Sequence, residues 1–328
     1  MRRRWNMKNN NADKFTPGYV ELHRKGELSR RADELERLLT GCTVCPHRCE
    51  VNRFDEYSGR CYSGFKPIVY SYSPHHGEED PLSGWRGSGT IFFGSCNLRC
   101  VFCQNYTISQ RPREARDREI SIPSLASIML SLQEQGCHNI NFVSPTHFVP
   151  QIVRAVELAV EDGLHLPLVY NSNGYDSVET LRLLDGIVDI YLPDLKYGDN
   201  EQAYKYSKIK DYVTHARNAL REMYRQVGKD PVVGDDGIMH RGMIIRHLML
   251  PNDISGSRET VRWIAENLSP DVYISVMSQY HPANKAFEYD ELSRGLSQKE
   301  YHVVVDEVRR HKMTNALIQG EPVDFLNF

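Results

Sequence analysis

The stretch Cys96-Asn97-Leu98-Arg99-Cys100-Val101-Phe102-Cys103 organises the chain, and it follows closely on the apolar run 90–93. Its three cysteines have the spacing C-x3-C-x2-C. Thiolates are soft ligands that favour iron–sulfur clusters, zinc or Cu(I). A four-iron, four-sulfur cluster normally takes four cysteines in all, so three thiols leave one iron free to hold a substrate. Phe102 adds an aromatic face beside the last thiol.

A zinc knuckle is the competing interpretation of these eight residues. Such zinc sites need a fourth Cys or a His at short spacing, and none follows Cys103. The nearest candidate, Cys137, lies a predicted helix away, where a small buried apolar role suits it. The stretch therefore favours an iron–sulfur cluster with one open position.

A second group of cysteines precedes this stretch. Cys42-Thr-Val-Cys45-Pro-His-Arg-Cys49 is followed, after eleven intervening residues, by Cys61. Four thiolates complete a tetrahedral zinc site, and an auxiliary iron–sulfur cluster uses the same ligands. We predict that these four cysteines share one metal centre, with zinc and iron–sulfur both open.

Length and composition limit the classes of protein to which this chain can belong. A chain of 328 residues suits about two domains, or one barrel with an extension. With 40 basic against 43 acidic residues, neither nucleic acid nor a membrane surface is indicated as a partner. The basic start has no apolar segment after it, and no run reaches the roughly 18 apolar residues of a spanning helix. We therefore expect a cytoplasmic protein, in which cysteines serve as metal ligands rather than disulfides.

After residue 89, short apolar runs alternate with helical patterns, which is typical of a parallel sheet with helices outside it. The predicted strands cover residues 90–93, 139–143, 167–170, 187–192, 243–250 and 272–277. The helices predicted between them cover residues 124–135, 150–161, 177–185, 201–227 and 258–267. The sequence thus predicts an α/β fold built as a six-stranded barrel.

Flanking segments complete the predicted organisation. Residues 27–39 have leucines and an alanine at helical spacing, and residues 62–89 have the Gly, Pro and Ser content of a linker. A tight turn and small hairpin are predicted at Asp235-Asp236-Gly237. Residues 297–313 form a predicted helix which, with the tail 316–320, caps the barrel. The predicted domains are 1–88 (extension), 89–285 (barrel) and 286–328 (helical cap).

The cluster stretch resembles the loop C-x3-C-x-Φ-C (Φ aromatic) of radical S-adenosylmethionine (SAM) enzymes. This resemblance implies a partial (β/α)6, TIM-like radical SAM barrel, here with an N-terminal Cys-rich extension. It also implies a 4Fe-4S cluster on Cys96, Cys100 and Cys103, whose open iron is chelated by SAM. An electron from the cluster would cleave SAM to methionine and a 5′-deoxyadenosyl radical.

Polar residues follow each predicted strand, and chemistry in parallel barrels gathers at those strand ends. The chain from about residue 89 to residue 283 resembles the glycyl-radical-enzyme activating branch, typified by pyruvate formate-lyase activating enzyme. The resemblance implies roles near SAM for Asn173, Asp194 and Lys196, and for Arg246 at the SAM carboxylate, which a guanidinium binds in bidentate fashion. Four further residues, in the cluster loop and at other strand ends, are predicted to contact the cluster or SAM: Phe102, Ser144, Thr146 and Asn171. His281 and Tyr280 are the predicted catalytic residues, as a proton relay or as groups that position the substrate.

Two departures from that branch bear on the substrate. The second strand usually ends in Gly-Gly-Glu-Pro, which receives the SAM amino group, but here it ends in Val143-Ser-Pro-Thr-His. Ser144 and Thr146 would have to take that role. The four extra cysteines also precede the barrel instead of following the cluster loop.

Three functions stay open from the sequence. The first is an activase that takes hydrogen from a glycine of a glycyl radical enzyme, with flavodoxin or ferredoxin as the electron donor. The second is the same radical chemistry on a small molecule or a peptide. The third is a non-enzymatic zinc protein. For single residues such as Asp194, Arg246 and the two histidines His147 and His281, a turn cap, an ion pair or a plain loop role is the alternative.

Overall fold

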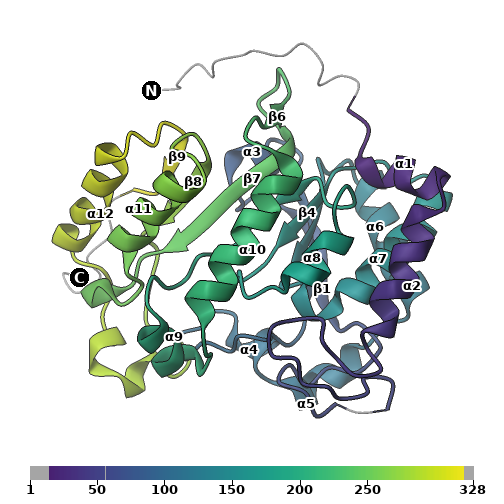
Figure 1. Ribbon diagram of the computed structural model, residues 1–328, viewed down its shortest axis with the longest axis horizontal. Helices are drawn as coiled ribbons and strands as arrows, with labels where there is room; N and C mark the ends of the chain where they lie inside the picture. The colour runs from purple at the N-terminus through teal and green to yellow at the C-terminus, as the bar shows by residue number, and fades with distance from the viewer. Residues whose placement is uncertain (1–14, 56, 321–328) are drawn as a thin grey trace.

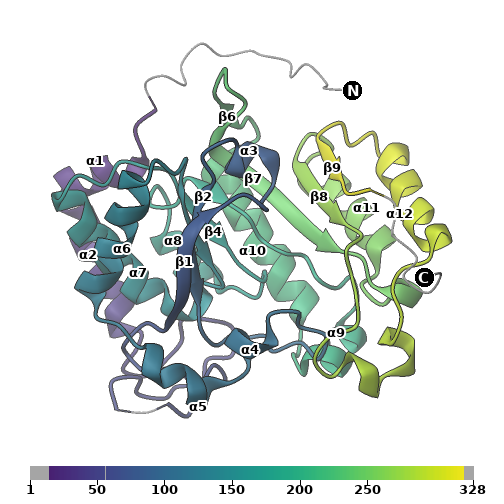
Figure 2. The ribbon, with the colours of Figure 1, turned by 180° about the vertical axis from the view of Figure 1, so that it is seen from behind.

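A curved sheet with seven parallel strands forms the centre of the computed structural model, which describes residues 15–55 and 57–320 (Figure 1). In spatial order the parallel strands are β2 (Ser88–Phe93), β3 (Ile140–Val143), β4 (Leu168–Asn171), β5 (Ile190–Tyr191), β7 (Met239–Leu248), β8 (Tyr273–Met277) and β9 (Ala316–Ile318). Strand β1 (Val69–His75) pairs antiparallel with β2 and forms one edge, while β9 forms the other. In the described residues the sheet does not close, and Figure 2 views it from the side of these two edges.

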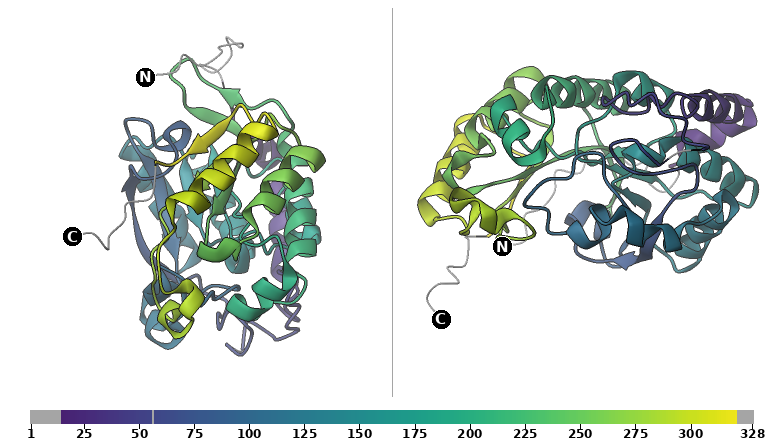
Figure 3. Two further views of the ribbon diagram at one scale, coloured as in Figure 1. Left: turned by 90° about the vertical axis from the view of Figure 1, so that its left-hand side faces the viewer. Right: turned by 90° about the horizontal axis from the view of Figure 1, so that it is seen from below.

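Helices cover the convex side of the sheet, as seen in the view from below in Figure 3. The longer helices that follow strands β2 to β8 are α6 (Ile122–Glu134), α7 (Val149–Glu161), α8 (Val178–Leu183), α9 (Asn200–Ser207), α10 (Tyr212–Val227), α11 (Ser257–Asn267) and α12 (Gln298–Arg310). Side-chain caps begin α6 and α12: Ser121 accepts from the Ser124 amide, and Ser297 forms a capping box with Glu300. In the part of the chain that the structure describes, no helix is long and apolar enough to cross a membrane.

The N-terminal segment packs on the barrel through α1 (Gly18–Arg24) and α2 (Glu27–Arg37). The predicted apolar stripe of α2 is buried: Leu28, Ala32, Leu35 and, just beyond the helix, Leu39. Arg154 of α7 holds its outer side by pairing with Asp33 and Glu36, the latter at 2.9 Å. The predicted amphipathic helix is therefore confirmed, and it is an integral part of the barrel surface.

Alternation along the strands divides the inner face of the sheet into two zones. On β7 the inward residues are Ile244, Arg246 and Leu248, since side chains two apart lie on one face. Ile244 belongs to a small interior core, whereas Arg246 and Leu248 line a cavity nearer the carboxyl ends of the strands. The same division holds on β8, where Tyr273 is in the core and Ser275 lines the cavity. The strands thus place an apolar base beneath a polar chamber.

A short helix, α3 (Asp80–Ser83), contributes to that base. It lies in the segment between β1 and β2, and its Leu82 is fully buried in the interior core with Val169 and Ile190. The α3 segment is fixed to β3 because Asn139 donates its side-chain amide to the Leu82 carbonyl at 2.9 Å. The N-terminal ends of the strands are therefore covered from within the barrel.

The predicted fold class is confirmed, with three differences in detail. All six predicted strands exist, but residues 62–89, interpreted as a linker, contain β1 and α3. The tail predicted as a cap forms β9, a further parallel strand. The single helix predicted at 201–227 divides into α9 and α10, because Lys208 and Asp211 adopt left-handed backbone angles (φ 55° and 54°). The turn at Asp235-Asp236-Gly237 does join an antiparallel pair, β6 (Val232–Val233) with β7, as predicted.

Gly174 is the point where the chain after β4 touches the chain after β5. Its φ is +78°, and a Cβ atom there would lie 2.2 Å from the carbonyl oxygen of Asp194. Gly228 has the same φ of +78°, but a Cβ atom at that position would meet nothing within 4 Å. Of these two glycines, Gly174 alone sets the position of Asp194 through its lack of a side chain.

We predict that Gly174→Ala destabilises the protein much more than Gly228→Ala. Both substitutions incur about 1–2 kcal/mol for the left-handed backbone. Gly174→Ala must in addition displace the Asp194 carbonyl, an overpacking cost of about 1–3 kcal/mol. Urea unfolding of the two variants and the wild type measures the difference. Equal losses in the two variants would mean that the two strand ends are not in fixed contact.

Candidate active site

One cavity of about 730 Å³ lies at the carboxyl ends of the parallel strands. Its size is in the range of small-molecule sites in proteins. The lining comes from every parallel strand or the residues that directly follow it, together with the cluster loop and the segment after β1. Predicted site residues that line it are Cys96, Cys100, Phe102, Cys103, Ser144, Asn171, Asn173, Asp194, Lys196 and Arg246. The structure therefore brings ten predicted residues, scattered over 150 positions of sequence, to one chamber.

The cluster loop is held in shape by its own backbone and by two neighbouring elements. Ser95 and Arg99 adopt left-handed angles (φ 66° and 61°), which turn the chain sharply before and within the loop. The Cys100 carbonyl accepts from the side chain of Gln110 at 2.7 Å, and the Val101 amide donates to the Tyr206 carbonyl at 2.8 Å. These two contacts fix the loop to its neighbours.

The three thiols of the loop suit a multi-iron cluster. The Cys96 sulfur accepts from the Leu98 amide and the Asn173 side chain, each at 3.4 Å, and the Cys103 sulfur lies 3.2 Å from the Ser109 hydroxyl. Three thiols supply one ligand to each of three irons of a cuboidal cluster and leave the fourth iron open. A structural zinc ion takes four protein ligands, so the donor set fits a cluster better than a single zinc ion.

Burial raises the pKa of the Cys100 thiol to about 12 and also raises the pKa of the Cys103 thiol. Lys196 opposes both shifts through its positive charge. Because metal ligation requires thiolates, loading the loop with iron must release protons.

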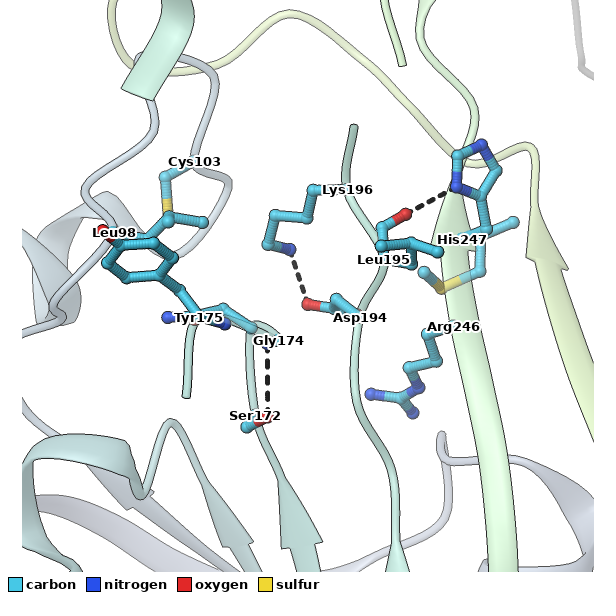
Figure 4. A network of polar contacts seen from close by, with 12 residues as sticks. Leu98, Cys103, Ser172, Gly174, Tyr175, Asp194, Leu195, Lys196, Arg246 and His247 are labelled. Carbon is cyan, nitrogen blue, oxygen red and sulfur yellow. Dashed lines mark hydrogen bonds and ion pairs between the residues drawn. The ribbon is translucent and has the colours of Figure 1, made fainter. Parts of the chain in front are cut away.

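Lys196 lies between the cluster loop and β5, as Figure 4 shows. Its ammonium is 2.5 Å from the Asp194 carboxylate. Burial alone would lower the pKa of Lys196, but Asp194 and the nearby Cys100 and Cys103 outweigh it and raise the pKa above its ordinary value. Lys196 is therefore a permanent cation beside the three thiols.

The segment that carries Asp194 and Lys196 is tied to β7. The Leu195 amide donates to the Arg246 carbonyl, and the Arg246 amide donates to the Pro193 carbonyl, each at 2.8 Å. The buried ring of His247 adds a contact to the Leu195 carbonyl at 2.6 Å (Figure 4). A parallel ladder thus continues beyond β5 and fixes the predicted Asp-Leu-Lys residues.

The base of the cavity holds three charged side chains, two of which sequence reasoning missed. Glu78 and Glu79, from the segment between β1 and α3, both pair with Arg246. Arg246 binds Glu79 in bidentate fashion, with N–O distances of 2.8 and 2.7 Å. Burial would raise the pKa of Glu79, but the charge and hydrogen bonds of Arg246 lower it below its ordinary value. The alternative role named for Arg246, an ion pair, is therefore observed, while its contact with SAM stays a prediction.

Three predicted site residues of the barrel lie outside the cavity lining. Thr146 is buried and donates to Asp176 at 2.7 Å. Tyr280 is buried behind Phe102, at a ring distance of 6.2 Å, and donates to the Leu292 carbonyl. His281 is exposed, and its Nδ1 lies 3.0 Å from the amide nitrogen of Gln104. Their roles in catalysis stay predictions, since the first two have structural partners and the third is at the rim.

The family assignment follows from comparison with known proteins. The sequence model of the radical SAM superfamily matches residues 90–249. An uncharacterised protein of Methanocaldococcus jannaschii is 33% identical over 310 residues, which cover 92% of this chain and 84% of the relative. A second uncharacterised protein of that organism is 26% identical over 178 residues, or 50% of this chain and 51% of the relative. A partial barrel with a three-thiol loop defines a class of cluster-dependent enzymes, and the chain belongs to the radical SAM superfamily.

Solved structures show more distant similarity. Methylornithine synthase is 16% identical, with 91% of this chain and 77% of that chain covered and a TM-score of 0.43. The FeFe-hydrogenase maturase HydG from Carboxydothermus hydrogenoformans is 12% identical, with 93% and 65% covered and a TM-score of 0.47. The chain thus spans just under two thirds of the maturase.

We predict that Arg246→Ala lowers the free energy of unfolding by about 3–5 kcal/mol, because it leaves Glu78 and Glu79 buried without a counter-charge. Arg246→Lys keeps one charge and should lose less. The control is Arg309→Ala, which removes an exposed ion pair with Asp306 and should cost about 0.5 kcal/mol or less. Chemical denaturation measures all three.

The predicted contact between Arg246 and SAM is tested separately, by measuring SAM affinity. Loss of a charge-assisted bond of about 1.5–3 kcal/mol should weaken SAM binding about tenfold or more in Arg246→Ala protein with full iron content. Unchanged SAM affinity would leave Arg246 as a structural partner of the two glutamates.

Proposed function

We propose that this protein cleaves SAM reductively at a 4Fe-4S cluster held by Cys96, Cys100 and Cys103, and takes a hydrogen atom from a substrate in the same cavity. The observation that carries the proposal is the shared chamber, in which the three thiols face the polar ends of β4, β5 and β7. When bound, the cluster supplies one electron and SAM supplies the adenosyl radical. The residues of the chain bind and orient both groups.

The charge of the cavity suits this cofactor. SAM carries a sulfonium and an ammonium cation against one carboxylate. Among the described lining residues, four carboxylates stand against three Lys and Arg side chains. The excess carboxylate complements the net positive charge of SAM. Glu78 and Glu79 thereby supply the acidic groups that the end of β3 lacks.

Lys196 has a distinct task in this proposal. Its positive charge favours the thiolate forms of Cys100 and Cys103 that iron requires. Asp194 holds the ammonium in place at 2.5 Å. In this proposal the Asp194–Lys196 ion pair therefore helps to position the cluster and also lines the SAM site.

The substrate favoured by resemblance is a glycine in a glycyl radical enzyme, with flavodoxin or ferredoxin as the electron donor. Its support is the similarity of residues 171–174 and 194–196 to the strand ends of the activating branch. A small molecule or a peptide is the second candidate. Its support is the altered end of β3 and the buried carboxylates Glu78 and Glu79, which give the inner end of the cavity a polar surface of its own.

We predict that Cys100→Ala abolishes SAM cleavage, because the cluster loses one of three ligands. The measurement is 5′-deoxyadenosine formed by anaerobically reconstituted, dithionite-reduced protein with SAM. Cys137→Ala is the matched control: Cys137 is also buried but does not line the cavity, so its product yield should equal that of the wild type. Wild-type yield from Cys100→Ala would refute the proposed cluster site.

The activase function predicts a glycyl radical in a partner. Reduced protein and SAM are incubated with each glycyl radical enzyme of the source organism, and the radical is detected by electron paramagnetic resonance. The Cys100→Ala protein is the negative control. If no partner gains a radical while small-molecule extracts stimulate deoxyadenosine formation, the second candidate function replaces the first.

A further inference from the structure

A buried carboxylate joins the ends of strands β3 and β4. Asp176 is only 2% exposed and does not line the cavity. One of its oxygens, Oδ1, accepts from the hydroxyls of Thr146 at 2.7 Å and Tyr170 at 2.8 Å. The other oxygen, Oδ2, accepts from the hydroxyl of Ser172 at 2.6 Å. Three hydroxyls thus converge on a carboxylate that does not itself reach the cavity.

The burial of this carboxylate has an energetic cost. Burial raises the pKa of Asp176, and the hydrogen bonds from the three hydroxyls oppose that shift. An apolar side chain could fill the same space without the loss of hydration. We therefore expect Asp176 to perform a task that an apolar side chain could not, namely to hold the three hydroxyls in fixed positions.

Ser172 connects Asp176 to the turn that follows β4. Its hydroxyl donates to Asp176 and accepts from the backbone amide of Gly174 at 3.2 Å (Figure 4). The Ser172 carbonyl accepts from the Asp194 amide at 2.9 Å. The hydroxyl of Ser172 therefore fixes the chain on both sides of Asn173, the residue at the centre of the turn.

The side chain of Asn173 reaches from this turn to the cluster loop. Its amide nitrogen donates to the Cys96 sulfur at 3.4 Å and to the side-chain oxygen of Asn97 at 2.7 Å. Its side-chain oxygen accepts from the Tyr175 amide at 3.0 Å, and Asn97 donates to the Tyr175 carbonyl at 3.0 Å. A shift of the turn must therefore move the Asn173 amide relative to the Cys96 sulfur.

The cluster loop is held from its other side by the N-terminal segment. His47 lies 2.8 Å from the carbonyl oxygen of Asn97. The four cysteines of that segment do not line the cavity, and their shared metal centre stays a prediction: Cys42, Cys45, Cys49 and Cys61. With Asn97 held in this way, the contact between Asn173 and Cys96 depends on the position of the turn.

A hydrogen bond to a cluster sulfur changes how readily the cluster accepts an electron. The reduced cluster carries one more negative charge, and an N–H dipole directed at a ligand sulfur stabilises that charge. Hydrogen bonds to the sulfurs are accordingly among the features that set the reduction potentials of iron–sulfur clusters. The Asn173 amide should therefore make the midpoint potential of a cluster on Cys96 less negative.

We propose that Asp176 is a positioning residue for the cluster. Through Ser172 and the turn, it holds the Asn173 amide on the Cys96 sulfur and so raises the reduction potential. This role rests on the proposed cluster at Cys96, Cys100 and Cys103, and it gives a task in electron transfer to a residue outside the cavity.

The test compares Asp176→Ala with Asp176→Asn, which remove the same charge. Asparagine keeps an oxygen that accepts from Thr146 and Tyr170 and an amide that donates to Ser172, whereas alanine keeps neither. The full chain is reconstituted anaerobically with iron and sulfide. Its midpoint potential is measured by a redox titration followed by electron paramagnetic resonance, without SAM because Asn173 is also a predicted SAM contact. We expect a more negative midpoint in Asp176→Ala than in Asp176→Asn protein.

The same pair of substitutions in Asn173→Ala protein shows whether the effect passes through the amide. The Cys96 sulfur has lost its side-chain donor in this background, so Asp176→Ala and Asp176→Asn should give equal midpoints. A difference that persists without Asn173 would overturn the proposal. Equal midpoints of the two Asp176 variants in the otherwise wild-type chain would also overturn it.

Ser172→Ala takes the place of Asp176→Ala if that variant fails to fold. It removes the hydroxyl that joins Asp176 to Gly174 without changing the charge, so the midpoint should again become more negative. Tyr170→Phe is the matched control, because it removes a hydroxyl from the same carboxylate but lies in β4, before the turn. Its midpoint should stay close to that of the wild type, and equal midpoints in Ser172→Ala and Tyr170→Phe protein would contradict the proposal.

The iron content separates this proposal from the proposed SAM cleavage. Reconstituted wild-type protein without iron would overturn both, because no cluster would then exist at Cys96. Iron-loaded variants with equal midpoints would overturn the role of Asp176 alone and leave the cluster site in place.

Discussion

The ion cluster of Arg246, Glu78 and Glu79 is the interaction on which the active-site cavity depends. Two carboxylates in a barrel interior repel each other unless a cation lies between them. The guanidinium meets this need with a fork to Glu79 and a further contact to Glu78. In doing so it joins the segment after β1 to β7, on opposite parts of the sheet. The base of the cavity is consequently charged, and it lies above the apolar core at the amino ends of the strands.

That base also explains how one chain can combine a stable barrel with a polar chamber. Apolar inward residues such as Val169 and Ile244 pack with Leu82 at the amino ends of the strands. Two residues further along, the same face carries Asn171 and Arg246. The change from core to site therefore occurs within single strands, and the loops at the carboxyl ends need only position the thiols and the ammonium of Lys196.

The features that could be predicted from the sequence are those encoded locally. The cysteine spacing is a local pattern, and so are the apolar runs of the strands and the polar residues that end them. Glu78 and Glu79 could not be identified, because their role comes from a partner 167 residues away and their surroundings have the composition of a loop. The strand β9 has three residues, too few for a periodic pattern to be recognised, and its identity depends on pairing with β8.

The contact between Arg246 and Glu79 also bears on how the chain is made. During synthesis the β1–β2 pair and α3 emerge from the ribosome long before residue 246 exists. Until then the two glutamates lack their cation, and Leu82 lacks the strands β7 and β8 that complete its surroundings. Closing so long a chain segment is slow and entropically costly. The nascent N-terminal half therefore exposes an incomplete interior, the kind of intermediate that chaperones bind.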